Sequence, residues 1–121
     1  MSAAIGRRAF GGVVAAALVT VLAACGKKKP EVVPSASGVD PVVTVAAIDN
    51  RFEPASIEVK EGDAVRWVFK GVMEHDVVAE DGSFVSELQK TGEYVHVFTK
   101  AGEYPYDCSV HPEMTGVVTV K

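Results

Sequence analysis

The chain has 121 residues, of which 48% are hydrophobic and 23% are charged, so a single small domain is expected. The formal net charge of −4 argues against a nucleic-acid partner, because domains that bind DNA or RNA carry an excess of Lys and Arg. The two cysteines, Cys25 and Cys108, would form one disulfide in an exported protein unless each has its own chemistry.

Residues 1–24 predict an export signal. An arginine pair at residues 7–8 supplies the positive start, and the apolar run over residues 13–24 is too short to span a bilayer comfortably. The run leads into Leu-Ala-Ala-Cys at residues 22–25, which resembles the lipobox of bacterial lipoproteins. The resemblance implies that Cys25 receives a diacylglyceryl group and becomes the N-terminus of the mature protein.

Two other interpretations of this leader stay open. An ordinary secretory signal would be cleaved near Ala24, and Arg-Arg-Ala-Phe at residues 7–10 resembles a twin-arginine export signal. A lipid on Cys25 would tether the protein to a membrane without spanning it, at the outer face of the cytoplasmic membrane or in the periplasm. Removal of the leader leaves ten basic and sixteen acidic residues, a surface that would permit a basic partner.

Residues 25–41 predict the lipid-bearing cysteine followed by a flexible linker. Lys, Pro, Ser, Gly and Glu dominate this stretch, and three prolines oppose regular structure. A disordered stem of about 15 residues would hold the domain some tens of ångströms from the membrane. The lysines at residues 27–29 either attract anionic lipid headgroups or simply keep the stem solvated.

Residues 42–121 have the pattern of a small all-β domain. Short runs rich in Val, Thr and aromatic residues alternate with turns that contain Gly, Pro, Asn or Asp. We expect about seven or eight strands and a β-sandwich. A loop is expected at residues 71–74 and irregular structure at residues 84–92. The expected strands cover residues 42–48, 56–60, 64–70, 75–79, 93–99, 103–108 and 115–120.

Three possible metal ligands lie close together near the C-terminal end: Cys108, His111 and Met114. Tyr104, Tyr106 and Cys108 alternate, so they share one face of the expected strand, and Cys108 ends that strand. A thiolate, an imidazole and a thioether at this spacing suit a copper ion that changes its oxidation state. Such an ion needs a fourth ligand from elsewhere in the chain.

The fourth ligand is predicted to be a histidine, and the chain has three. His75 lies at the start of an expected strand beside a loop, where a side chain can reach a neighbouring loop. His96 lies in mid-strand in phase with Phe98, which favours a structural role. Met73 lies on the expected loop and is interpreted as a surface residue. We therefore predict His75 as the ligand.

From residue 42 to 121 the chain resembles the cupredoxins, in particular the plastocyanin, amicyanin and halocyanin branch of these small blue copper proteins. The resemblance implies a cupredoxin-like Greek-key β-sandwich of about eight strands and one type 1 copper ion, which carries single electrons between redox proteins. The residues that carry the resemblance are 52–54, 59–63, Trp67, 75–77, 98–104 and 108–114. The ligands that it implies are His75, Cys108, His111 and Met114.

The resemblance also implies how electrons enter and leave. They pass through His111, around which Val72, Met73, Val110 and Pro112 would form an apolar docking patch. Partners of such a patch are redox proteins that bind transiently, and the protein itself is expected to be a monomer.

Three positions depart from the pattern of the family. Phe69 stands where an Asn usually ties the ligand loops together by hydrogen bonds, so that support must come from elsewhere. Asp107 stands where plastocyanins have a tyrosine that offers a second electron route. Glu74 stands where proline is frequent, and its charge changes the surface near the metal.

Other functions fit these residues less well than an electron carrier does. A copper-delivery module would favour exposed clusters of Met and Cys, whereas this chain has one enclosed set. A copper oxidase needs more histidines than three, and a dinuclear purple centre needs a second cysteine in the loop. A zinc site of Cys, two His and a water would leave Met114 without a role. We predict a protein that is not an enzyme, with copper delivery as the alternative.

Overall fold

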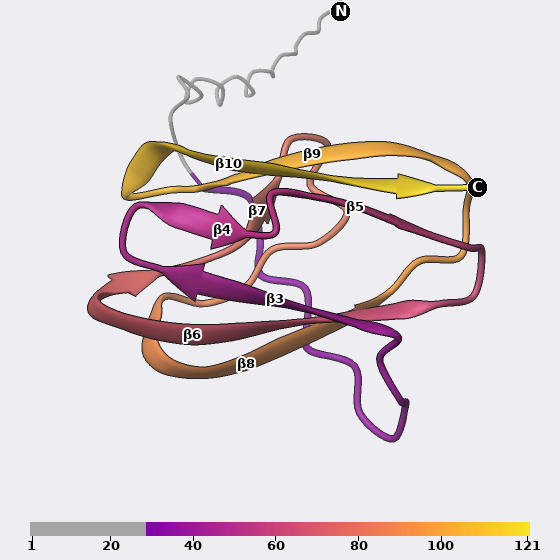
Figure 1. Ribbon diagram of the computed structural model, residues 1–121, viewed down its shortest axis with the longest axis horizontal. Coiled ribbons are helices and arrows are strands. Elements are labelled where there is room, and N and C mark those ends of the chain that lie inside the picture. Colours follow the sequence, from indigo (N-terminus) through magenta and orange to yellow (C-terminus); the bar gives the residue numbers. More distant parts are fainter. Residues whose placement is uncertain (1–28) are drawn as a thin grey trace, which may run out of the picture.

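The computed structural model describes residues 29–121, so the predicted export signal and Cys25 lie outside the described residues. Within them, eight strands form two four-stranded sheets, and no helix occurs. Figure 1 shows the sheets as two layers with the strands running along the long axis of the domain. The predicted all-β sandwich is therefore confirmed. The described part of the chain contains no helix suited to spanning a membrane.

The first sheet has the strand order β4-β3-β6-β8. β3 pairs antiparallel with β4 and parallel with β6, and β6 pairs antiparallel with β8. Trp67 lies in the middle of this sheet, opposite Val45 on one side and Tyr94 on the other. The strands are β3 (Val43–Ile48), β4 (Arg51–Glu53), β6 (Ala64–His75) and β8 (Gln89–Val97).

The second sheet has the strand order β5-β10-β9-β7. β10 pairs parallel with β5 and antiparallel with β9, and β7 pairs antiparallel with β9. The pairing of β9 with β10 is shifted between His111 and Thr115, so the backbone bulges there. The strands are β5 (Ser56–Val59), β7 (Val78–Ala79), β9 (Gly102–Cys108) and β10 (His111–Val120).

The space between the sheets is filled by aromatic side chains. Trp67 is fully buried, stacks on Phe84 with ring centroids 5.4 Å apart, and meets Tyr106 edge-on at 5.5 Å. Burial of a large apolar side chain contributes about 1.5–3 kcal/mol. The period-two alternation in β6 explains this packing, since Val65, Trp67 and Phe69 all point inward.

The structure differs from the expected elements at the metal end of the sandwich. Residues 71–74 were expected to be a loop, but they belong to β6, which runs on to His75. The pairing of β6 with β8 is shifted between Lys70 and His75. Most of residues 71–74 are exposed. Gly71 and the charged Glu74 are typical of a turn, although the backbone of this stretch is extended.

The predicted flexible linker also differs from the structure over residues 33–36. The Val33 N–H donates to the Val85 carbonyl at 2.8 Å, and the Ala36 N–H donates to the Val95 carbonyl at 2.8 Å. β8 is the last strand of its sheet, so its outer edge has free N–H and C=O groups that such a segment can satisfy. The linker therefore packs against the sandwich here.

Candidate metal site

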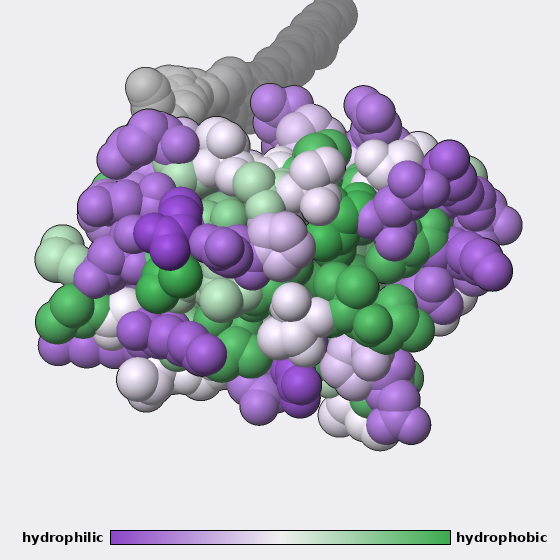
Figure 2. Space-filling view, viewed as in Figure 1, coloured by the Kyte–Doolittle hydropathy of each residue, from purple (hydrophilic) through white to green (hydrophobic). Residues whose placement is uncertain are grey.

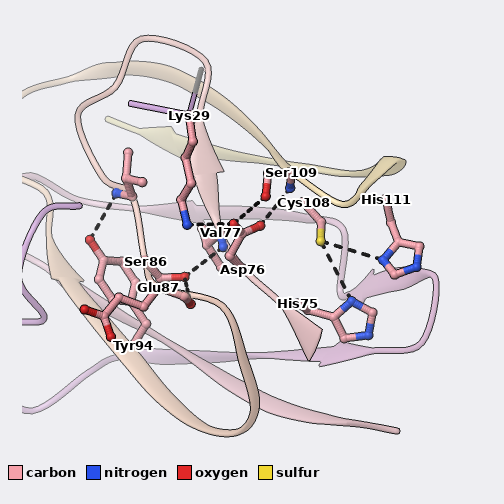
Figure 3. A network of polar contacts seen from close by, with 11 residues as sticks. Lys29, His75, Asp76, Val77, Ser86, Glu87, Tyr94, Cys108, Ser109 and His111 are labelled. Carbon is pink, nitrogen blue, oxygen red and sulfur yellow. Dashed lines mark hydrogen bonds and ion pairs between the residues drawn. The ribbon is translucent and has the colours of Figure 1, made fainter. Parts of the chain in front are cut away.

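Three predicted ligands meet where β6 and β9 end and β10 begins. The Cys108 Sγ lies 3.8 Å from the His75 Nδ1 and 3.9 Å from the His111 Nδ1 (Figure 3). One ligand atom from each of the three residues lies within 4.8 Å of the others. The structure thus brings together His75 from the first sheet and the two ligands of the Cys108–His111 turn from the second.

The separations fit a bound metal ion. An ion with bonds of about 2.0–2.3 Å to a sulfur and an imidazole nitrogen holds those atoms about 3.5–4 Å apart. His75 and Cys108 are fully buried, whereas His111 is partly exposed. Burial raises the pKa of the Cys108 thiol, so a metal ion that binds there must displace its proton. The site is an enclosed set of donors with one imidazole edge near solvent.

Met114 follows His111 within the bulge of β10. Its side chain is 1% exposed and packs in the core together with Cys108. The bulge allows this inward orientation, since it interrupts the regular pairing between His111 and Thr115. The predicted axial ligand therefore lies on the buried side of β10, the strand that begins at His111.

His96 lies outside this group of donors. It packs in β8 between Phe84 and Phe98, with ring centroids 5.1 Å and 4.8 Å away. Burial lowers the pKa of His96, and the negative charge of Asp81 partly opposes that shift. This packing fits the structural role expected for His96. Met73 is 53% exposed, as a surface residue would be.

Asp49 is a residue of the site that the sequence interpretation missed. Its Oδ1 lies 3.1 Å from the His75 Nε2 and also accepts the Val72 N–H at 3.2 Å. The hydrogen bond with His75 lowers the pKa of Asp49. A carboxylate on the outer nitrogen fixes the ring orientation that turns Nδ1 towards Cys108. In the sequence, Asp49 looked only like the start of a turn.

Gly71 leaves room for this contact. A Cβ atom at Gly71 would lie 2.5 Å from the Asp49 Oδ1 and 2.7 Å from the His75 Nε2. Both separations are too short for real contacts, so a larger residue would displace the carboxylate or the imidazole. The glycine therefore serves the approach of Asp49 to His75.

Asp76 is the second residue that was missed. Its fully buried carboxylate accepts the Ser109 N–H at 2.7 Å and the Ser109 hydroxyl at 2.6 Å. Asp76 follows His75 and Ser109 follows Cys108, so these hydrogen bonds tie the two ligand-bearing elements together (Figure 3). Phe69, where the family pattern has an Asn, is instead buried in the core. Asp76, and not a residue at position 69, therefore makes the hydrogen bonds that join the two ligand-bearing segments.

Apolar side chains are exposed near the end of β6 and beside the start of β10. Val72, Met73 and Val110 are 75%, 53% and 50% exposed, and Pro112 is exposed beside them. Figure 2 shows apolar side chains among hydrophilic ones at the left-hand end of the molecule, where β6 ends and β10 begins. An exposed apolar group of this kind is characteristic of docking surfaces.

The family model of the cupredoxin-like domain matches residues 14–120. The chain belongs to the cupredoxin-like family. It is 32% identical over 88 residues to amicyanin from Paracoccus denitrificans, which covers 68% of this chain and 67% of that one. It is 34% identical over 84 residues to plastocyanin from Scenedesmus fuscus, covering 58% of this chain and 86% of that one.

Solved structures agree with this membership. A reduced amicyanin mutant superposes with a TM-score of 0.61 at 32% identity and covers 73% of this chain and 90% of its own. A purple cupredoxin from Nitrosopumilus maritimus superposes with a TM-score of 0.60 at 28% identity, covering 65% and 99%. Family membership and the Cys, His and Met donors together make one type 1 copper ion the cofactor of this chain.

Proposed function

We propose that the protein is a membrane-tethered blue copper protein that carries single electrons between redox partners. The copper would cycle between Cu(II) and Cu(I), held by His75, Cys108, His111 and Met114. The observation that carries the proposal is the buried Cys108 sulfur, which both imidazole Nδ1 atoms face at 3.8 Å and 3.9 Å. The relatives named amicyanin and plastocyanin support this electron-carrier function.

The protein's contribution is to hold the donors in place while the charge on the metal changes. Asp49 fixes one imidazole from outside, and the hydrogen bonds between Asp76 and Ser109 fix the turn that bears the thiolate. A preformed set of this kind needs little rearrangement when an electron arrives or leaves. Fast transfer without substrate chemistry is what a carrier requires, so no catalytic residue is assigned.

His111 is the proposed port for electrons. It is the partly exposed ligand, and the exposed residues Val72, Met73, Val110 and Pro112 would form the apolar patch around it. A partner that docks on this apolar patch would bring its redox centre close to the imidazole. Small apolar interfaces of this kind form and dissociate quickly, as a carrier with several partners needs.

The proposed anchor is a lipid on Cys25, which would place the protein at the outer face of the cytoplasmic membrane or in the periplasm. Residues 33–36 are hydrogen-bonded to the sandwich, and Lys29 forms an ion pair with Asp76. Only residues 26–28 would then lie between the lipid-bearing Cys25 and Lys29, the first residue that contacts the sandwich. An extended chain advances about 3.3–3.6 Å per residue, so the domain would stay within roughly 14 Å of the anchor.

Substitution of the ligands tests the proposal. The copper-loaded protein is expected to show an intense blue thiolate-to-copper band that disappears in Cys108→Ser. His75→Ala should abolish the band, while His96→Ala should keep it, because His96 packs between two phenylalanines. A colourless protein with copper bound would overturn the proposal. Exchange of copper with a soluble acceptor, without electron transfer, would favour the delivery function.

A further inference from the structure

Asp76 is a carboxylate without exposure to solvent, and it is paired with a residue far away in the sequence. The Lys29 Nζ lies 2.8 Å from the Asp76 Oδ2, and the lysine side chain is 27% exposed (Figure 3). The other contacts of this carboxylate are the N–H and hydroxyl of Ser109. The carboxylate therefore meets one cation and two hydrogen-bond donors.

Such a carboxylate needs its cation. Removal of one partner of a buried ion pair leaves an uncompensated charge in a poorly solvated place, which strongly destabilises the fold. A second carboxylate, that of Asp107, lies close enough to Asp76 for the two charges to interact. Lys29 is thus the charge that balances this end of the site.

Lys29 is delivered by a docked segment, residues 29–36, which we call the N-terminal strap. The strap is bound to β8 and the loop before it by its Val33 and Ala36 N–H groups. The Tyr94 hydroxyl donates to the Val33 carbonyl at 2.9 Å, and the Val95 N–H donates to the Ser35 hydroxyl at 2.9 Å. The lysine therefore reaches Asp76 from a segment with its own hydrogen bonds to the sandwich.

We propose that Lys29 is a positioning residue of the copper site. Its ammonium group balances Asp76, and Asp76 in turn holds Ser109 and the turn that bears the Cys108 thiolate. The N-terminal strap is then a part of the metal centre and not a passive tether. The effect on the copper rests on the proposed function, whereas the effect on Ser109 can be measured in the metal-free protein.

A double-mutant cycle of Lys29→Met and Asp76→Asn tests this positioning role. In the metal-free protein, Lys29→Met should lower the urea midpoint of unfolding and speed hydrogen exchange of the Ser109 amide by about tenfold or more. Lys29→Arg should keep the urea midpoint and the exchange rate close to the wild-type values, because it retains the positive charge. In the Asp76→Asn background the carboxylate charge is gone, so Lys29→Met should change neither quantity further.

Lys121→Met is the matched control, because it removes the same charge from an exposed pair with Glu58 at the opposite end of β10. In the copper-loaded protein, Lys29→Met should lower the reduction potential more than Lys121→Met does, since an uncompensated Asp76 charge favours Cu(II). If the wild-type protein shows no blue band, the proposed function fails, but the metal-free cycle still tests the role of Lys29.

Two results would overturn the inference. One is a Lys29→Met variant whose urea midpoint and Ser109 exchange rate equal those of the wild type. The other is a Lys29→Met substitution that lowers stability equally whether residue 76 is Asp or Asn. If Lys29→Met does not fold, the variant that combines Lys29→Met with Asp76→Asn shows whether the unpaired Asp76 charge is the cause. A double variant that folds shows that the lost partner of Asp76 caused the failure. A double variant that fails to fold, while Asp76→Asn alone folds, excludes the proposed route.

Discussion

His75 is held from both sides of its imidazole ring. Its Nδ1 faces the Cys108 sulfur at 3.8 Å, and its Nε2 faces the Asp49 carboxylate at 3.1 Å. Carboxylates in this position make an imidazole a better and more precisely oriented metal ligand. The properties of the site therefore depend on residues that do not touch the metal.

Asp49→Ala should weaken copper binding by about 10–100-fold, because the ring of His75 loses the partner that orients it. Competition with a coloured copper chelator measures the affinity. Asp40→Ala is the control, since it removes the same charge from an exposed position in the N-terminal segment. Equal affinities for Asp49→Ala and Asp40→Ala would show that the carboxylate contact has no role.

His96 should make the fold less stable in mild acid. Burial lowers the pKa of His96 in the folded protein, so the unfolded chain takes up its proton at a higher pH. The stability present above about pH 6.5 is then lost as the pH falls through the folded-state pKa. Urea unfolding between about pH 8 and 5 should show a smaller loss for His96→Gln than for the wild type. A steeper loss in the variant would contradict this sign.

The sequence predicted the donors but not the residues that hold them. Cys108, His111 and Met114 lie close together in the chain, so their spacing is visible in the sequence. Asp49 and Asp76 act through contacts across 26 and 33 positions in the sequence, and single acidic residues carry no local signal for that. Such contacts are fixed by strand pairing, which depends on the whole sandwich.

At the level of elements, β8 carries the N-terminal strap on its outer edge. Tyr94 joins the two, because its hydroxyl accepts the Val85 N–H at 3.2 Å and donates to the Val33 carbonyl at 2.9 Å. Burial raises the pKa of Tyr94 to about 12. The composition of the strap looked like a flexible linker, because prolines and small polar residues give no sign of an available strand edge.

Tyr94→Phe should lower the free energy of unfolding by about 1–3 kcal/mol, since it leaves a buried N–H and a carbonyl without their partner. Chemical unfolding measures the loss, and limited proteolysis should cut the strap faster. Tyr104→Phe is the matched control, because its hydroxyl makes one exposed hydrogen bond to the Lys100 carbonyl. A larger effect in Tyr104→Phe would contradict the docking of the strap.

For the whole molecule, local alternation was enough to predict a sandwich of short strands. The pairing of the strands could not be predicted from the sequence, because parallel pairs such as β3 with β6 join residues far apart in the chain. The extension of β6 through residues 71–74 was missed for a related reason. Its backbone is extended, but its exposed side chains do not alternate between core and solvent.

The proposed lipid anchor would determine where the whole protein is located. Cys25→Ser should move the protein from the membrane fraction to the soluble fraction, because no acylated thiol remains. Immunoblots of the two fractions measure the change, and Cys108→Ser serves as control because it alters the metal site and keeps Cys25. Equal membrane retention in wild type and Cys25→Ser would exclude this anchor.

The proposed carrier function requires that one copper ion in this site accepts and returns single electrons. A spectroelectrochemical titration of the copper-loaded wild-type protein tests it most directly. We expect a blue band that bleaches on reduction and returns on oxidation along one reversible, one-electron curve. A copper-loaded protein without that band, or with a band that stays unchanged across the titration, would contradict it.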